Sequence, residues 1–537
     1  RLLRAGATLS PEFIARNPIR DQFSAFVFST LGRGYVPFYD LMLGAGQVLA
    51  KGEGYQRWLA SGGANSAMVS IDRNYVENLV RKMSDPSLVG TMKNVVRSPL
   101  DLLRAASEVM ENATRVGEHM RLTKAGLPWE AAGYGAREVT LDFQRIGAKM
   151  RAVNQIIAFF NAQVEGVDRA ARAMIDHPFR FAATVGAGIT LPSLGLWAAN
   201  KDDPRMKEIP RWEKDIFWIV PTDNWQPATQ QEANRVPQGY ARQRPDGQWE
   251  INKGNIYRIP KPFELGVAFG SVPERIMDAY YSKDPKAFKN VFSSIQQAFL
   301  PNFVPNSVSP IIEQFSNRSL FTDRPLVPQY LQDMLPKYQS NPYTTDTAKA
   351  IGNFISKIPG IPESLASPII VENYIRAWTG GLGLHALALS DGILQGTGVA
   401  PTKISPTLTN ADKTLIKAFS VRFPEAGANS IQDFYEEYNK RAQVAKTVKY
   451  LKKTGEAGEA QDLLRDNVIA SAEGIHKAIG AQLKMVRDVY RNPKMSPDEK
   501  RNFIDMSYLQ MIKMAQTGNV VFQKTADLFK TKKEQNQ

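Results

Sequence analysis

The residues VTLDFQRIGAKMRAVNQIIAFFNAQVEGVDRAARAMID, numbers 139–176, carry the strongest periodic pattern in the chain. Apolar side chains recur there at alternating steps of three and four, at Phe143, Ile146, Met150, Val153, Ile157, Phe160, Val164, Val167, Ala171 and Met174. This period predicts the seam of a coiled coil. At about 1.5 Å per residue the helix would be roughly 55 Å long. Pro178 predicts its end at His177, because proline disfavours helical geometry in the preceding residue.

The seam of this helix has two interpretations. It could pack antiparallel inside its own chain, or it could line a symmetric oligomer. In the second case the residues in contact would be Phe143, Ile146, Met150, Val153, Ile157, Phe160, Val164 and Val167.

A charge-free stretch follows at once, since no residue between Arg180 and Lys201 is charged. Twenty helical residues span about 30 Å, the thickness of the hydrocarbon core of a bilayer. Pro192 and three glycines weaken such a helix in water, although both residue types are tolerated in membranes. The stretch is therefore either a buried core helix or a membrane-inserting segment. The second interpretation assigns lipid contact to Phe181, Leu191, Leu194, Leu196 and Trp197.

The regions on either side complete a mostly α fold. We expect an N-terminal helical region (1–138), the heptad helix with the charge-free stretch (139–200), an irregular region rich in Trp and Pro with short helices (201–402), and a C-terminal helical region (403–537). Asp246-Gly247 predicts one small β-hairpin in the third region. The apolar run from Phe23 to Ala50 must pack against another segment, another subunit or lipid.

Local signals also organise the C-terminal region. Its apolar period predicts one amphipathic helix through Leu464, Val468, Ile475, Ile479, Leu483 and Val486. Ser496-Pro497-Asp498-Glu499 predicts the start of the next helix, by a capping box with proline at the first helical position. Four aromatic residues of the third region, Trp212, Trp218, Trp225 and Trp249, are expected to anchor their loop to the helical body. Stacking on nucleic-acid bases and a place at a membrane interface are the alternatives.

Composition limits the classes of partner and of chemistry. The chain has no cysteine, which excludes disulfides, thiolate metal sites and cysteine nucleophiles. Its net charge of +14 favours polyanions such as DNA, or an anionic membrane surface. Small basic clusters occur at Lys446, Lys449, Lys452 and Lys453 and at Lys530, Lys532 and Lys533, where a solvated helix face or a frayed tail is the simpler interpretation. The chain begins with Arg1 and without a recognisable signal peptide, which indicates a processed chain or part of a longer one.

Motifs for catalysis are missing from the sequence. It has no GxxxxGK[ST], HExxH or GxSxG pattern, and Gly381-Leu-Gly383 lacks the βαβ context of a dinucleotide site. None of the four histidines, His119, His177, His385 and His476, has another histidine at metal-ligand spacing. We therefore expect no enzyme activity, no metal and no cofactor.

Four local motifs resemble a known family. They are Arg16-Asn17-Pro18-Ile19-Arg20-Asp21, then Phe159-Phe160-Asn161-Ala162-Gln163 with Gly166-Val167-Asp168-Arg169, then Trp212-Glu213-Lys214-Asp215 with Trp218, and finally Arg258-Ile259-Pro260-Lys261-Pro262-Phe263-Glu264-Leu265-Gly266 with Phe269-Gly270-Ser271. Together they resemble the large polyvalent-protein-associated domain, type 38, of giant polyproteins of phages and mobile elements. They also resemble the internal core, or ejection, proteins of short-tailed phages.

The resemblance implies a structural role rather than a catalytic one. Such proteins are stored inside the capsid, leave through the tail and reassemble into a conduit for DNA across the host periplasm and inner membrane. The implied partners are other copies of the chain, internal virion and portal proteins, double-stranded phage DNA bound without sequence preference, and the host inner membrane. An inert scaffold module that holds enzymatic domains of a polyprotein inside the capsid is the alternative.

Overall fold

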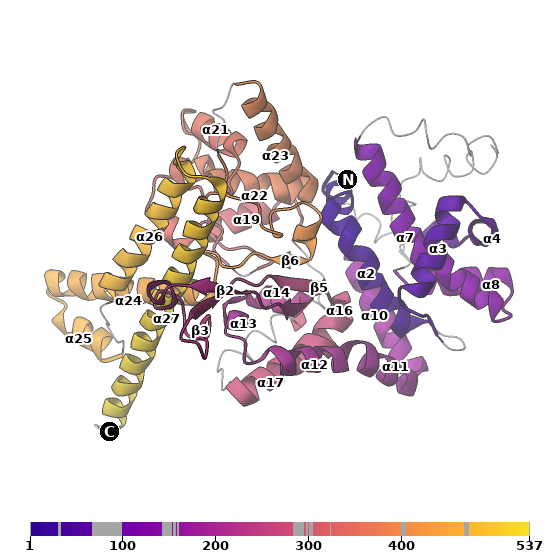
Figure 1. Cartoon of the computed structure of the whole chain (residues 1–537), viewed down its shortest axis with the longest axis horizontal. Coiled ribbons are helices and arrows are strands. Elements are labelled where there is room, and N and C mark those ends of the chain that lie inside the picture. Colours follow the sequence, from indigo (N-terminus) through magenta and orange to yellow (C-terminus); the bar gives the residue numbers. More distant parts are fainter. Residues whose placement is uncertain are drawn as a thin grey trace.

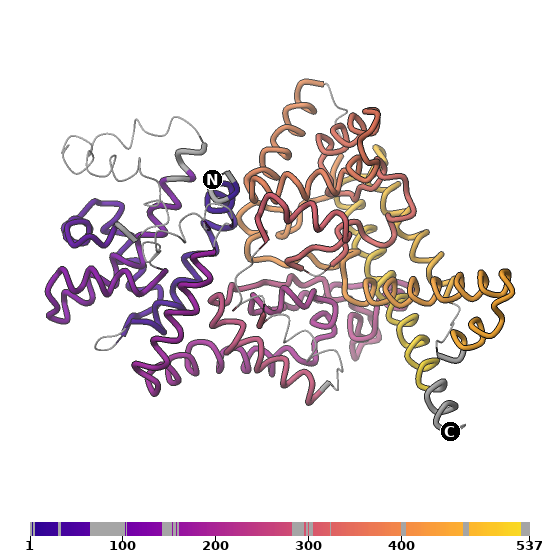
Figure 2. The backbone as a smooth tube through the Cα atoms, turned by 180° about the vertical axis from the view of Figure 1, so that it is seen from behind, coloured from indigo at the N-terminus to yellow at the C-terminus, as the bar shows by residue number. Residues whose placement is uncertain are grey.

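A computed structural model describes residues 2–29, 34–66, 99–141, 153, 157, 160–282, 295, 296, 299, 304–322, 324–398, 404–466 and 472–535. Helices make up most of these residues, which confirms the mostly α fold. The N-terminal helices lie at one end of the molecule and the C-terminal helices at the other, with two small sheets between them (Figure 1). The view from behind shows the same order (Figure 2).

The N-terminal end is built around a close crossing of two helices. Its helices are α1 (Leu2–Thr8), α2 (Pro11–Phe28), α3 (Tyr39–Ala50), α4 (Glu53–Ala60), η1 (Gly63–Ser66), α7 (Pro99–Lys124) and α8 (Trp129–Glu138). At the crossing of α3 and α7, a Cβ on Gly44 would lie 1.9 Å from the carbonyl oxygen of Ala113. The backbones therefore touch directly. Part of the apolar run packs here, since Val48 is buried, while Met42 stays 71% exposed.

The helix predicted over 139–176 is shorter in the described residues. Thr140 and Ile157 lie in bends, Val153 is helical, and the continuous described helix is α10 (Phe160–Asp176). The other residues between 142 and 159 lie outside the described residues. The buried face of α10 includes the polar residues Asn161, Glu165 and Arg169. The spacing of apolar residues predicts that the apolar seam is buried, and it could not indicate that the face with these polar residues would be buried. The predicted end is confirmed, because α10 stops at Asp176 and Pro178 begins the next helix.

The charge-free stretch lies in one continuous helix of three parts, α11 (Pro178–Val185), the π-turn η4 (Gly186–Thr190) and α12 (Leu191–Asn200). Pro192 has no N–H, and its ring would clash with a carbonyl four residues earlier in an α-helix. The wider π-turn lies directly before the proline, where it accommodates both effects.

Two three-stranded antiparallel sheets follow. The first has the order β1-β5-β6, from strands Phe217–Pro221, Ile256–Pro260 and Ser420–Val421. The second has the order β2-β4-β3, from strands Trp225–Ala228, Trp249–Asn252 and Ala241–Gln243. Short helices α13 (Arg205–Glu208), α14 (Arg211–Ile216) and α15 (Gln230–Ala233) connect them. The strand content is therefore larger than the single hairpin that the sequence predicts.

The predicted hairpin exists, as β3 and β4, but its loop is longer than the two residues Asp246-Gly247. Gln243 pairs with Trp249, and the amide N–H of Gly247 donates to the carbonyl of Arg244 at 2.9 Å. Gly247 has φ +85°, so glycine serves here as the left-handed residue of a five-residue loop.

Helices cover the sheets and form the C-terminal end. From 263 to 418 they are α16 (Phe263–Gly266), η5 (Val267–Ser271), α17 (Val272–Ser282), α19 (Ser309–Ser316), α20 (Gln329–Gln332), η6 (Pro336–Tyr338), α21 (Asp346–Ile355), η7 (Glu363–Ala366), α22 (Pro368–Thr379), α23 (Gly381–Gly396) and η8 (Ile416–Ala418). Helix α22 precedes Gly381, so no strand leads into the glycine pattern there. The last four are α24 (Asn429–Thr454), α25 (Ala457–Asp466), α26 (Glu473–Arg491) and α27 (Pro497–Gln535).

The C-terminal helices share the largest apolar cluster of the described residues. Ile479, Leu483 and Val486 are buried in it, as their spacing predicts. The single amphipathic helix predicted through Leu464 and Val486 is wrong, because Ala472 is not helical and α26 begins after it at Glu473; Val468 of that prediction lies outside the described residues. The capping box is confirmed: Ser496 N–H donates to Glu499 Oε2 at 2.8 Å, and Glu499 N–H donates to Ser496 Oγ at 3.3 Å.

Candidate functional site

The helix from Pro178 to Asn200, which contains the charge-free stretch after Arg180, has one face fixed to the protein. Its buried side chains recur every four residues, at Phe181, Val185, Ile189 and Ser193. The first three pack in a cluster with Phe28 and Trp218 of the body. The indole N–H of Trp218 donates to Ser193 Oγ at 2.7 Å, and Thr190 Oγ1 donates to the carbonyl of Phe269 at 2.8 Å.

The opposite face of this helix is exposed and uncharged. Phe179 is 92% exposed and Leu191 66%, and only 22% of the most apolar window of the helix is buried. Smaller exposed residues share this face, namely Ala182, Ala183, Ala187, Gly195, Ala198 and Ala199. The helix runs along the lower edge of the molecule in Figure 1. By length and composition it is the one described helix that could cross a membrane.

Aromatic side chains flank the C-terminal end of this helix. Trp197 lies 5.3 Å from Tyr281 of α17 between ring centroids, and its indole N–H donates to Asp278 at 2.8 Å. Tyr280 and Tyr281 are 77% and 59% exposed. Aromatic rings with one polar atom are typical of residues at a membrane–water boundary.

The structure separates the residues predicted to contact lipid. Leu191 faces outward, whereas Phe181 faces the core. Leu194, Leu196 and Trp197 are half-buried. The helix is therefore neither enclosed in a core nor free on all sides, and lipid contact stays a prediction.

The predicted oligomer seam is also divided. Phe143, Ile146 and Met150 lie outside the described residues. Ile157 and Phe160 are buried, Val153 and Val167 are half-buried, and Val164 is 40% exposed. Oligomer formation through these residues stays a prediction.

A buried network of charges is the site that sequence reasoning missed. The four motifs that carry the family resemblance lie far apart in the chain, on α2, α10, α14 and the segment from β5 to η5. Charged side chains of these motifs meet in the interior between α2, α10, β1 and α16, where desolvation makes unpaired charges costly.

Lys261 is one centre of this network and is 2% exposed. Its ammonium group donates to Glu274 Oε2 at 2.8 Å, to Ser271 Oγ at 2.9 Å and to the carbonyl of Lys214 at 2.9 Å. Three different segments are thus held by one side chain. Burial lowers the pKa of Lys261, and the carboxylate of Glu274 opposes that shift.

Arg258 forms a second centre. Its guanidinium donates to Glu213 Oε1 at 2.8 Å and to the carbonyl of Lys417 at 2.9 Å. Arg16 and Arg258 both lie against the ring of Phe217, at 5.1 Å and 4.9 Å from its centroid, and Arg16 also donates to the carbonyl of Ala418 at 2.8 Å. Cation–π contacts of this kind stabilise a desolvated guanidinium.

The third part of the network joins α10 to α2 and to α16. The guanidinium of Arg169 lies 3.9 Å from the ring centroid of Phe28. The carboxylate of Glu264 approaches Gly166 so closely that a Cβ there would lie 2.8 Å from its oxygens. Burial raises the pKa of Glu264 to about 7, and it raises the pKa of Asp21 to about 7 as well.

The signal for this network was present in the motifs themselves. In these motifs the neighbours of the charged residues are apolar or small, as in Glu264-Leu265-Gly266. A solvated helix face would carry more polar residues next to its charges. Lys261 and Arg258 bond to carboxylates and to backbone carbonyls of other segments, so they hold these segments together.

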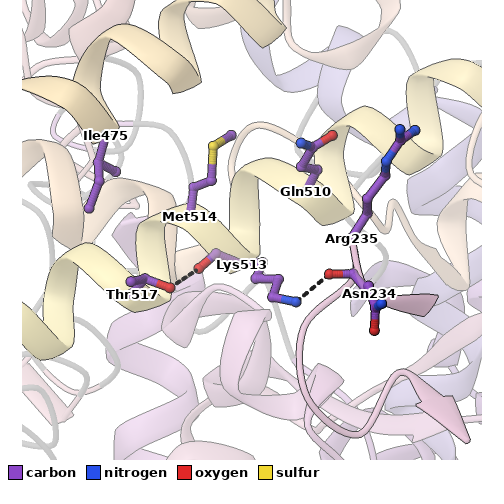
Figure 3. A pocket seen from close by; sticks show the side chains of 7 residues that line it. All are labelled: Asn234, Arg235, Ile475, Gln510, Lys513, Met514 and Thr517. Atoms are coloured by element: carbon purple, nitrogen blue, oxygen red, sulfur yellow. Dashed lines mark hydrogen bonds between the residues drawn. The ribbon is translucent and has the colours of Figure 1, made fainter. Parts of the chain in front are cut away.

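A shallow pocket of about 250 Å³ lies elsewhere, between α26, α27 and the end of α15 (Figure 3). Its lining is Asn234, Arg235, Ile475, Gln510, Lys513, Met514 and Thr517. Lys513 donates to the carbonyl of Asn234, so its ammonium group is already engaged. This mixture of amides and single charges offers no acid–base pair.

The histidines have structural surroundings. His385 bonds to Glu12 at 3.0 Å, His476 stacks on Tyr438 at 4.3 Å, and His119 lies 3.3 Å from the carbonyl of Trp129. His177 directly precedes α11. Within the described ranges, no group of three or more His, Asp or Glu side chains is placed to hold a metal ion.

Fold and site together define a mainly helical protein with ion pairs in its interior and a long helix with an exposed apolar face on its surface. Residues 203–411 match the family model described as large polyvalent protein associated domain 38. The match covers less than half of the chain and includes the third and fourth motifs, and it confirms the resemblance over this range. Residues 203–411 are thus similar to a domain of the polyvalent-protein-associated class. No curated protein and no solved structure matches the chain.

Proposed function

We propose that this chain is a non-catalytic virion protein of a tailed phage that is ejected into the host and helps to form a conduit for the genome. The observation that carries the proposal is the exposed, uncharged face of the Pro178–Asn200 helix. Water-soluble proteins rarely leave so long an apolar face uncovered without a partner. Lipid of the inner membrane, or another copy of the chain in the conduit, would cover it.

Other features support the same role. Residues 203–411 match a domain associated with large polyvalent proteins. The resemblance of the four motifs to ejection proteins implies storage inside the capsid before transfer to the periplasm and inner membrane. Partners would then be other copies, internal virion and portal proteins, and DNA. The net charge of +14 suits a protein that handles DNA.

A vesicle-leakage assay tests the proposal. The purified chain should release dye from anionic vesicles and float with them in a density gradient. Leu191→Lys places a charge on the outward face and should lower leakage by about tenfold or more, because lysine is costly where leucine contacts lipid. Leu389→Lys on α23 is the matched control, since Leu389 is 67% exposed and Leu191 is 66% exposed. That variant should leak dye like the parent protein.

Intact vesicles with the parent protein would refute the membrane role. The family description would then favour the scaffold alternative, in which the chain holds enzymatic domains of a polyprotein inside the capsid. Equal leakage by both lysine variants would show that the Pro178–Asn200 helix is not the lipid contact.

A further inference from the structure

We infer that the second half of α24 is a binding surface for the phosphate backbone of duplex DNA. This inference rests on the proposed function, which includes DNA among the partners, and it names the surface for that partner. Its test is independent of the membrane role, because α24 is separate from the Pro178–Asn200 helix (Figure 1). From Lys440 to Thr454 the chain has six basic residues and no acidic one. The helix projects with α25 at the edge of the molecule farthest from the N-terminal helices (Figure 1), and the view from behind agrees (Figure 2).

The exposed side of α24 is a basic stripe, formed by Lys446, Lys449, Tyr450 and Lys453. All four side chains are exposed, and Tyr450 is 64% exposed. The lysines follow each other at steps of three and four, so they lie on one face over roughly 10 Å. Phosphates recur every 3.4 Å or so along one strand of a duplex, and the basic stripe therefore spans about three of them.

The basic stripe is held outward by the opposite side of the helix. Val448 is 6% exposed, and Val444 and Leu451 are half-buried. Arg441 is also turned inward, where it donates to the carbonyl of Phe522 and lies 4.8 Å from its ring centroid. The helix is thus anchored by Val448 and Arg441, and the stripe lysines are not needed for that anchoring.

The stripe lysines are available for an outside partner. None of the three forms an ion pair with any residue that the structure describes. The nearest acidic residues in sequence beyond them are Glu456 and Glu459, which follow the turn at Gly455, and these form no ion pair with the lysines in the same described part of the chain. A row of unpaired cations attracts a polyanion and releases its counterions on binding.

DNA fits the basic stripe better than lipid does. A helix that lies on a membrane needs bulky apolar side chains beside its cations. Here Tyr450 is an aromatic residue on the exposed side of α24, its other exposed neighbours include the polar residues Gln443, Thr447 and Thr454, and the aliphatic side of the helix packs inward. Tyr450 can donate its hydroxyl to a phosphate oxygen.

The test is a salt titration of binding to a short random-sequence DNA duplex between about 50 and 200 mM salt. Replacing Lys446, Lys449 and Lys453 together with Gln should remove about three phosphate contacts. The negative slope of log K against log salt should become less steep by about 3, and binding should weaken roughly 100-fold at physiological salt. The matched control replaces Lys124, Lys357 and Lys494, three exposed lysines on other parts of the surface, and changes the net charge equally. That control should keep nearly the parent slope.

Each outcome decides the inference. An unchanged salt slope in the stripe variant overturns the inference. An equal loss of DNA affinity in the control variant also overturns it, because net charge alone would then explain the loss. Binding of the stripe lysines to anionic vesicles but not to duplex DNA would also overturn it, by assigning the surface to lipid. Circular dichroism should show the same melting temperature for all three proteins, because the replaced side chains are exposed.

Discussion

Lys261 gives the sharpest test of the buried charge network. Replacing it with Met keeps the aliphatic stem and removes the ammonium group. Glu274 then loses its ion-pair partner at 2.8 Å, and Ser271 Oγ and the carbonyl of Lys214 each lose a donor. A carboxylate buried without its partner is the main cost.

The magnitude follows from those contacts. Breaking one partner of a buried pair costs about 3–5 kcal/mol. Burial already raises the pKa of Glu274, so protonation of that carboxyl limits the loss and favours the middle of this range, about 4 kcal/mol. For a unit of 150–250 residues this corresponds to a fall in melting temperature of about 10 °C.

A double-mutant cycle on the free energy of unfolding tests this estimate. Thermal and denaturant unfolding, followed by Trp fluorescence, would compare Lys261→Met, Glu274→Leu and the double variant. The double variant should recover at least half of the loss of Lys261→Met, because an apolar pair replaces an ion pair at little cost. The reasoning fails if Lys261→Met costs less than about 1 kcal/mol, or if the two single losses simply add.

Two further predictions concern pH and packing. Burial raises the pKa of Asp21 and of Glu264 to about 7, so the folded protein holds protons there that the unfolded chain has released. The melting temperature should therefore fall as pH rises from about 5 to about 8. The double variant Asp21→Asn with Glu264→Gln should show a weaker dependence of melting temperature on pH. The prediction would be contradicted by a melting temperature that rises with pH in the parent protein and loses this rise in the double variant. Gly44→Ala should destabilise the chain by about 3 kcal/mol, because the new Cβ would clash with the carbonyl of Ala113. Gly46→Ala should be neutral or slightly stabilising in the same unfolding assay, because a Cβ at Gly46 would have no neighbour within 4 Å. Equal effects of the two alanines would exclude the close crossing.

Local chemistry made parts of the fold predictable from the sequence. The helix end before Pro178, the turn at Gly247 and the cap at Ser496 each depend on a few neighbouring residues, and each is found where the sequence places it. The charge-free stretch is likewise predictable as a helix, because its uncharged composition and length are local properties.

The arrangement of the site depends on distant partners and could not be predicted. Val164 is 40% exposed although it fits the apolar period, whereas Arg169 of the same helix is buried against Phe28. Arg258 meets its carbonyl partner Lys417 across 159 residues of sequence. Period and spacing describe one element at a time, so they do not reveal which charges will be compensated inside.

Strand β6 has a practical consequence for anyone who wishes to isolate the matched domain. Ser420 and Val421 lie past residue 411, yet they pair with Tyr257 and Ile256 and close one side of the first sheet. A fragment cut at 411 would leave β5 as an open edge, ready to pair with a neighbouring molecule and precipitate. The recombinant piece that stays in solution should therefore extend beyond Val421.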